Sequence, residues 1–218
     1  MKKAFSIVGL VLLLDQVLKI WIKTHMTLGQ EFNVLGSWFI IHFTENPGMA
    51  FGMQFSGDYG KLLLSVFRII AILGIIYYLY SITRKPVKTG LLVSLSLVLA
   101  GAMGNMIDSA FYGMIFSSSN YFEVARLFPA EGGYGTFLHG RVVDMLYFPI
   151  LEGYYPSWIP FVGGDHFIFF RPVFNIADSS ITIGVLLMIL FQKQFFHQAE
   201  MHETADTPDN PQEQKFTG

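Results

Sequence analysis

The sequence contains no cysteine, which excludes disulfides, thiolate metal sites and a cysteine nucleophile. Charged residues are also few, at 14% of the 218 residues, whereas hydrophobic residues make up 52%. This composition and the positive mean hydropathy indicate a membrane protein rather than a soluble domain. The formal net charge is −2 and there is no basic cluster of the kind that binds phosphate groups. We therefore expect no nucleic-acid partner.

Several common catalytic motifs are missing as well. The sequence has no His-Glu-x-x-His pattern of zinc proteases, no Gly-x-Ser-x-Gly pattern of serine hydrolases and no Gly-x-x-x-x-Gly-Lys phosphate-binding loop. The six histidines are scattered without the spacing of metal ligands. We therefore expect neither a metal nor an organic cofactor, and carboxylates remain as the groups for chemistry.

Four apolar stretches are long enough to cross a membrane. They run over residues 4–22, 61–83, 90–108 and 173–195. Each could span about 30 Å of hydrocarbon at about 1.5 Å per residue. The first resembles a secretory signal peptide in its charge order, but Asp15 and Lys19 interrupt it and no small-x-small cleavage site follows. We expect it to be a retained span.

The segment between the second and third stretches predicts the orientation. Residues 84–88 form a short basic loop, which stays on the cytoplasmic side of a membrane. Both termini then lie in the cytoplasm, and residues 23–60 and 109–172 lie outside, where β-prone runs predict a small sheet. The predicted fold is an all-α membrane protein with four transmembrane helices and a small extracytoplasmic β-sheet. It forms one domain over residues 1–197, and the polar tail, residues 198–218, is expected to be disordered in the cytoplasm.

Ionisable side chains in these stretches are candidates for function, because each is costly in hydrocarbon unless it is paired or faces a cavity. Asp15 and Lys19 are four residues apart, share a helical face and are expected to form an ion pair. A turn over residues 45–52 contains Asn46 and Gly48 and exposes backbone at the membrane surface. By itself, a turn of this composition is common.

Three aspartates complete the set of polar candidates. Asn105 and Asp108 are three residues apart on one helical face, where a structural role and a chemical role are both open. Asn175 and Asp178 have the same spacing at the start of the fourth stretch, where Asp178 could also be a first-turn acid favoured by the helix dipole. Asp144 follows a short apolar run in the outside segment.

Paired aspartates offer a specific chemistry. Two carboxyl groups at low dielectric cannot both ionise easily, so they share a proton, and one activates water while the other polarises a carbonyl. Such a pair hydrolyses a peptide bond without a covalent intermediate. Carboxylates with asparagine could instead bind a hard cation or line an ion path, and spacing alone leaves that alternative open.

The order of the motifs resembles the lipoprotein signal peptidase (signal peptidase II) family. The resemblance covers residues 1 to about 196 and is carried by Asp15 with Lys19, Asn46-Pro47-Gly48, Gly104-Asn105-Met106-Ile107-Asp108, Val142-Val143-Asp144 and Asn175-Ile176-Ala177-Asp178. It implies an aspartyl endopeptidase of the bacterial inner membrane, with its site at the outer face among membrane lipids. The implied substrate is a prolipoprotein, cut just before the diacylglyceryl-modified cysteine.

The resemblance also assigns roles to residues. Asp144 and Asp178 match the catalytic pair. The matching positions that support the site are Asn46, Gly48, Asn105, Asp108, Asn175, Asp15 and Lys19. The main alternative is a small ion or proton carrier with the aspartates as relay groups, and a further one is a scaffold whose outside sheet binds a partner.

Two features depart from the family pattern. The family usually has Arg directly after the aspartate of its third motif, whereas this chain has Ser109. A basic partner for Asp108 must therefore come from elsewhere, and Arg141 is a candidate. The connection from Asp108 to Asp144 is also much longer than usual. We predict that residues 110–139 are an added surface loop.

Overall fold

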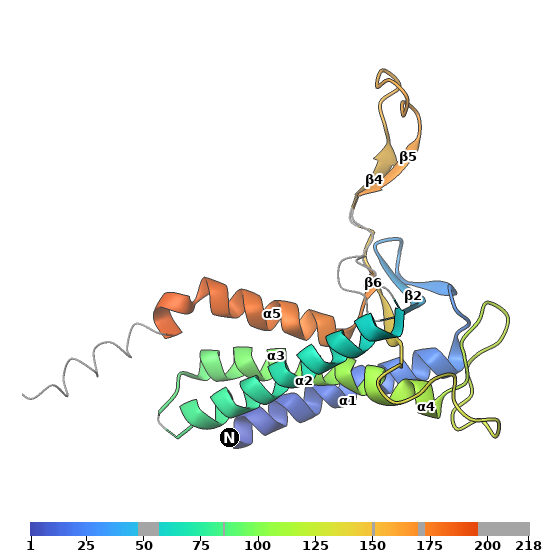
Figure 1. Ribbon diagram of the computed structural model, residues 1–218. Coiled ribbons are helices and arrows are strands. Elements are labelled where there is room, and N and C mark those ends of the chain that lie inside the picture. The colour runs from blue at the N-terminus through green and yellow to red at the C-terminus, as the bar shows by residue number, and fades with distance from the viewer. Residues whose placement is uncertain (48–56, 85, 150, 170–172, 196–218) are drawn as a thin grey trace, which may run out of the picture.

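Long helices form the body of the protein. The computed structural model describes residues 1–47, 57–84, 86–149, 151–169 and 173–195. The long helices are α1 (Lys2–His25), α2 (Gly57–Ile82), α3 (Thr89–Ile107) and α5 (Ile176–Leu190). They lie side by side in a bundle, and α1 begins at the end of the bundle where α5 ends (Figure 1).

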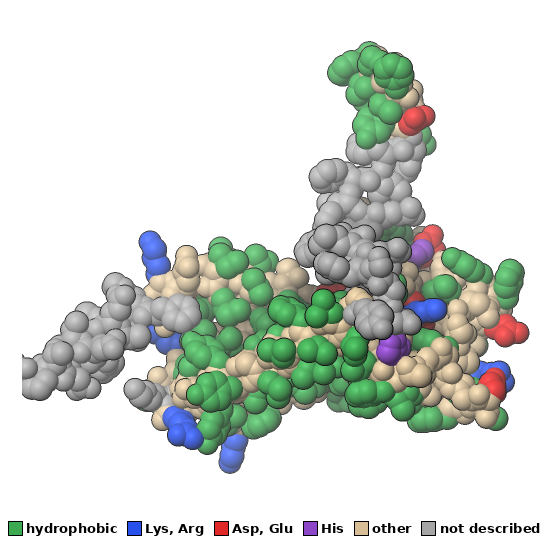
Figure 2. All heavy atoms as spheres, viewed as in Figure 1, with side chains coloured by type: hydrophobic (Ala, Val, Ile, Leu, Met, Phe, Trp, Pro, Cys, Tyr) green, Lys and Arg blue, Asp and Glu red, His purple; other side chains and the backbone are tan. Residues whose placement is uncertain are grey.

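Three apolar helices match predicted spans. Within the described residues, the helices long and apolar enough to cross a membrane are Lys2–His25, Gly60–Ile82 and Thr89–Ile115. Large hydrophobic side chains on α1 and α2 are exposed, and Figure 2 shows hydrophobic side chains covering much of the bundle surface. Such an apolar surface is stable against lipid rather than water. The chain is a multi-pass membrane protein.

The fourth predicted span is wrong at its start. Val173–Phe174 form strand β6, and α5 begins only at Ile176 and has 15 residues. At about 1.5 Å per residue it is shorter than the 30 Å or so of a hydrocarbon core. The reason is local: Asn175 has an extended backbone and caps the helix, so the preceding residues cannot join it. Within the described residues, α5 is an apolar helix too short to meet the length of a span by itself.

Glycines bring α3 and α5 into close contact. A Cβ on Gly101 would meet the carbonyl oxygen of Ala177 at 2.2 Å, and one on Gly184 would meet that of Ser94 at 2.6 Å. Small residues at these two places let the backbones approach, which is how helices pack within membranes. This contact places the start of α5 against the end of α3, where the polar motifs lie.

A small antiparallel sheet at one end of the bundle confirms the predicted one. Its strands are β1 (Glu31–Leu35), β2 (Phe39–Asn46), β3 (Val142–Tyr147) and β6, in the order β1-β2-β3-β6. Thr44 pairs with Asp144 and Leu146 with Phe174, so β3 lies between β2 and β6. Phe43, Val143 and Met145 are fully buried and join the sheet to the end of α1.

A second pair of strands forms a separate arm. β4 (Leu151–Tyr154) and β5 (His166–Phe169) form a hairpin that projects sideways from the bundle (Figure 1). Its tip carries Trp158 and Phe161, whose exposed fractions are 79% and 103%. Hydrophobic side chains gather at this tip (Figure 2). Tyr and Trp rings suit the membrane-water boundary, which is consistent with a hairpin on the membrane surface.

The predicted loop over residues 110–139 begins later than expected. The chain continues from α3 as a π-helical turn, Asp108–Tyr112, and then as the short helix α4 (Gly113–Ile115). Tyr112 and Phe116 are four residues apart, and both are buried in the core beside the sheet. Their burial accompanies about two further turns of helical chain, from Asp108 to Ile115. Gly48 and the tail over residues 198–218 lie outside the described residues.

Candidate active site

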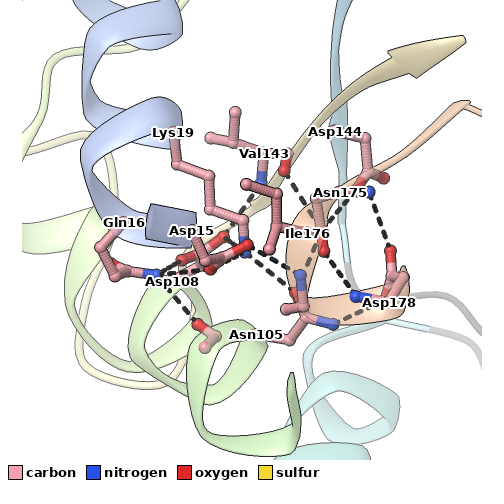
Figure 3. A network of polar contacts seen from close by, with 12 residues as sticks. Asp15, Gln16, Lys19, Asn105, Asp108, Val143, Asp144, Asn175, Ile176 and Asp178 are labelled. Carbon is pink, nitrogen blue, oxygen red and sulfur yellow. Dashed lines mark hydrogen bonds and ion pairs between the residues drawn. The ribbon is translucent and has the colours of Figure 1, made fainter. Parts of the chain in front are cut away.

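Two asparagines connect the two aspartates of the predicted pair. Asn175 Nδ2 lies 2.7 Å from Asp144 Oδ1 and 3.1 Å from Asn105 Oδ1. Asn105 Nδ2 in turn donates to Asp178 Oδ1 at 2.7 Å. Figure 3 shows these side chains converging from α3, β3 and the start of α5. The structure therefore links Asp144 to Asp178 through a chain of hydrogen bonds between the side chains of Asn175 and Asn105.

The local sequence Asn-Ile-Ala-Asp fixes the position of Asp178. Asn175 Oδ1 accepts the backbone N–H of Asp178 at 2.8 Å, and Asp178 Oδ2 accepts that of Asn175 at 3.4 Å. This reciprocal arrangement is a capping box, and it satisfies backbone groups that a helix start leaves unpaired. Asp178 is thus a capping residue and a member of the polar site, because its other carboxylate oxygen faces Asn105.

The surroundings of Asp144 favour its protonated form. Its exposed fraction is only 4%. Burial, together with the nearby negative charge of Asp178, raises the pKa of the Asp144 carboxyl to about 8, although Lys19 and the hydrogen bond from Asn175 act in the other direction. At neutral pH the neutral acid is the favoured form of Asp144.

Lys19 lies at the centre of the supporting contacts. Its Nζ lies 2.9 Å from Asp15 Oδ2, 2.9 Å from Asp108 Oδ2 and 3.0 Å from Asn105 Oδ1. All three ionic side chains have an exposed fraction of 0%. The predicted pair of Asp15 with Lys19 is present, and Asp108 joins it. A buried charge is tolerated only when it is paired and hydrogen-bonded. Each charge in this cluster therefore depends on the others for its stability.

The two carboxylates bound to Lys19 also position the chain beside each aspartate of the pair. Asp15 Oδ1 accepts the backbone N–H of Ala177 at 2.9 Å, directly before Asp178. Asp108 Oδ2 accepts the backbone N–H of Val143 at 3.2 Å, directly before Asp144. The supporting carboxylates therefore fix the backbone from which both candidate catalytic side chains project, the kind of support that a precise site needs.

The predicted partner of Asp108 was wrong. Arg141 Nη1 lies 3.1 Å from Glu45 Oε2, whereas the cation bound to Asp108 is Lys19. The physical reason is that Arg141 precedes β3 on the side facing Glu45 of β2, while Lys19 reaches Asp108 from inside the bundle. Asn46 pairs with Val142 in the sheet, two residues from Asp144. Within the described residues, no group of three or more His, Asp or Glu side chains has the arrangement of a metal site.

A sequence profile described as "Signal peptidase (SPase) II" matches residues 7–194. The chain belongs to the signal peptidase II family. It is 54% identical to a lipoprotein signal peptidase of Porphyromonas gingivalis over 190 residues, which are 87% of this chain and 82% of that protein. It is 38% identical to a lipoprotein signal peptidase of Amoebophilus asiaticus over 216 residues, or 96% of this chain and 87% of that protein.

The fold agrees with solved structures of a bacterial membrane enzyme. One, solved at 2.3 Å, has a TM-score of 0.56 at 27% identity and covers 96% of this chain and 94% of its own. Another, solved at 1.9 Å, has a TM-score of 0.58 at 29% identity and covers 87% and 92%. The bundle and the sheet are therefore the architecture of a bacterial membrane enzyme.

Sequence reasoning missed several polar residues of this peptidase. Gln16 Nε2 donates to Asp108 Oδ1 at 2.9 Å and completes the Lys19 cluster. Lys23 is fully buried and binds Glu45 and Ser119. The same four-residue spacing that pairs Asp15 with Lys19 also puts Lys23 on that helical face, and this signal would have found it.

Proposed function

We propose that this peptidase removes the signal peptide from diacylglyceryl-modified prolipoproteins by aspartyl-type hydrolysis at Asp144 and Asp178. The observation that carries the proposal is the chain of hydrogen bonds through Asn175 and Asn105, which links the two carboxyl groups. The names of the relatives supply the substrate class. The aspartate pair supplies the reaction type, because peptide hydrolysis by two carboxyl groups needs one acid and one base.

The roles of the pair follow from their surroundings. Asp144, whose pKa is raised to about 8, donates its proton toward the scissile carbonyl oxygen. Asp178 takes a proton from water as the water oxygen bonds to the carbonyl carbon. When the tetrahedral intermediate collapses, the C–N bond breaks, the proton on Asp178 passes to the leaving nitrogen and the hydroxyl proton returns to Asp144. Water is consumed, and both carboxyl groups end in their starting states.

The proposed topology has four spans, with α5 as the fourth. α5 starts at the active site rather than at the membrane surface, and the extended residues before it, Val173 and Phe174, pair with β3, an arrangement that a bilayer tolerates where backbone groups are satisfied by protein. The basic residues Lys2, Lys3, Arg84, Lys88 and Lys193 belong to the end of the bundle where α1 begins. By the positive-inside rule, both termini lie in the cytoplasm and the site lies at the outer face of the bacterial inner membrane. Residues 1–197 form the single peptidase domain.

The decisive test is replacement of each aspartate by asparagine. Asp144→Asn and Asp178→Asn each keep the size of the side chain, so we expect folded proteins that cleave a lipidated prolipoprotein at least about 10²-fold more slowly, the usual contribution of a general acid or base. Asp165→Asn, on the exposed hairpin, is the matched control and should cleave at the normal rate. Cleavage in gels or by mass spectrometry provides the measurement.

Two outcomes would contradict the proposal. Normal cleavage by both single variants would show that the pair is not catalytic. Proton or ion flux into liposomes that depends on Asp178 would favour the carrier hypothesis instead. The positions of the aspartates do not favour that hypothesis, because Asp15 and Asp108 both bind Lys19 beside the pair, so the four acids form one cluster rather than a path.

A further inference from the structure

Gln16 lies between the two carboxylates that bind Lys19 (Figure 3). Its Nε2 is 2.9 Å from Asp108 Oδ1, 3.1 Å from Asp15 Oδ2 and 3.3 Å from the carbonyl oxygen of Gly104. Gln16 and Asp15 belong to α1, whereas Asp108 directly follows α3. One side-chain amide therefore connects α1 to the end of α3 beside the site.

The surroundings of Gln16 permit one orientation of its amide. The end of the amide that faces three acceptors must be the NH₂ group, because the oxygen has no hydrogen to donate. The oxygen then points to the Tyr112 hydroxyl, which donates to Gln16 Oε1 at 3.2 Å. Tyr112 is 1% exposed, and its ring centre lies 4.8 Å from that of Phe116. A hydroxyl on a tightly packed ring therefore fixes the amide.

Tyr112 reaches Gln16 from the π-helical turn Asp108–Tyr112. The first residue of this turn contacts the nitrogen of the amide, and the last contacts its oxygen. Turns of this type are rare and occur frequently at functional sites. The turn therefore supplies a carboxylate to one end of the Gln16 amide and a hydroxyl to the other.

The two oxygens of the Asp108 carboxylate have different partners. Oδ2 binds Lys19 and accepts the backbone N–H of Val143, directly before Asp144. Oδ1 accepts from Gln16. The ammonium group of lysine is a compact charge with rotatable donors, so it neutralises a carboxylate without fixing the plane of the group. The contact of Gln16 with the second oxygen fixes that plane and keeps Oδ2 directed at Val143.

We propose that Gln16, oriented by the Tyr112 hydroxyl, is a positioning residue of the peptidase. It fixes the carboxylates of Asp15 and Asp108, which accept the backbone N–H groups directly before the two members of the aspartate pair. This inference rests on the proposed aspartyl mechanism. Gln16 acts through these carboxylates and needs no contact with the substrate, so its loss reduces turnover rather than substrate binding.

The first test compares Tyr112→Phe, Gln16→Met and the double variant in the full chain. Tyr112→Phe keeps the buried ring and removes only the hydroxyl, whereas Gln16→Met keeps the length of the side chain and removes the amide. We expect kcat per folded enzyme to fall about three- to tenfold in the first and about 10- to 100-fold in the second, with KM little changed. Because the hydroxyl acts through the amide, the double variant should match Gln16→Met alone.

Tyr134→Phe is the matched control. It also removes the hydroxyl of a partly buried tyrosine, but this hydroxyl accepts the backbone N–H of Arg141 at 2.7 Å. The substitution should lower the melting temperature and leave kcat near the wild-type value. Combined with Gln16→Met, its effect on stability should add to that of the single variant, as expected for sites without a shared partner.

A variant of matched size gives a second, pH-dependent readout. Gln16→Glu keeps the shape of the side chain but turns an oxygen toward the carboxylates of Asp15 and Asp108. The introduced carboxyl repels both when it is ionised and can donate one hydrogen bond when it is protonated. The other titratable groups around it are Lys19 and Tyr112. The ratio of variant to wild-type kcat should therefore rise as the pH falls, whereas a role in packing alone predicts a ratio near one at every pH.

Three results would overturn the inference. In the first, Gln16→Met lowers the melting temperature but keeps the wild-type kcat. In the second, Tyr112→Phe lowers kcat no more than Tyr134→Phe, or its effect adds in full to that of Gln16→Met. In the third, the kcat ratio of Gln16→Glu does not change with pH. If Gln16→Met does not fold, Tyr112→Phe, which removes a single oxygen, still decides the question. A failure of the proposed function is distinct, because it would appear as normal cleavage by Asp144→Asn and Asp178→Asn.

Discussion

Two lysines one helical turn apart on α1 form two buried clusters that differ in composition. Lys19 forms ion pairs with two carboxylates, Asp15 and Asp108. Each of these carboxylates also accepts a backbone N–H beside one member of the aspartate pair. Lys23 meets one carboxylate, Glu45, which it shares with Arg141. The first cluster has more negative than positive charge, and the second has more positive than negative charge.

The difference lies in what each cluster connects. Lys19 joins α1 to α3 and, through Asp15, to the start of α5, so it lies between three helices and the site. Lys23 joins α1 to the sheet and to the long connection before β3, where it also lies 5.1 Å from the ring centre of Tyr134. One lysine therefore stabilises the site itself, and the other attaches a segment beside it. Removing each lysine tests this distinction.

The largest expected effect is that of Lys19→Met. It leaves the carboxylates of Asp15 and Asp108 buried without their cation, and breaking a buried ion pair in this way costs about 3–5 kcal/mol. We expect a strong fall in the thermal unfolding midpoint in detergent and loss of cleavage, because both aspartates lose their backbone support. A Lys19→Met protein with normal stability and normal cleavage would show that the cluster does not support the site.

The next effect concerns pH. Asp144 must hold a proton for the proposed chemistry, and its pKa is raised to about 8 by burial and by Asp178. Cleavage should therefore fall about tenfold per pH unit above this value, as the proton is lost. Rates measured across this range on one lipidated substrate test the prediction. The Lys23→Met variant should show the same high-pH limb, and a profile that stays flat well above pH 8 would contradict the assignment of the proton to Asp144.

The smallest effect is expected for Lys23→Met. Glu45 keeps Arg141 and Ser119 as partners, and methionine can still pack against the rings of Phe116 and Tyr134. We expect a loss of about 1–2 kcal/mol of stability, typical of a single buried substitution, with cleavage largely retained. A loss of cleavage equal to that of Lys19→Met at matched stability would remove the distinction between the two clusters.

The sequence predicted the members of the site better than their partners. The cluster beside Asp144 and Asp178 contains five predicted residues, Asp15, Lys19, Asn105, Asp108 and Asn175. They lie together because a polar residue in an apolar stretch must be paired with another polar group. Arg141 was a candidate partner for Asp108, but it binds Glu45. Arg68, whose Nη1 donates to Ser109 Oγ, was overlooked, although a lone arginine in an apolar stretch is the same kind of signal.

The sequence also predicted some helix boundaries and missed others. Apolar length predicted α1, α2 and α3 well, since each stretch must cover a membrane by itself. It failed for α5, because the contacts of Asn175 with Asp144, Asn105 and Asp178 decide where that helix starts. It also failed beyond Asp108, where burial of Tyr112 and Phe116 extends the helical path.

By itself, the sequence determined that this is a membrane protein, where its first three helices lie and which polar residues are candidates for a site. These follow from local rules, since lipid demands apolar length and penalises every unpaired charge. Only the tertiary structure decided that Lys19 neutralises Asp108, that Arg68 binds Ser109 and that two asparagines join the aspartate pair. Those partners come from different helices and strands far apart in the chain, and their contacts depend on how closely the helices pack, which no spacing along the sequence specifies.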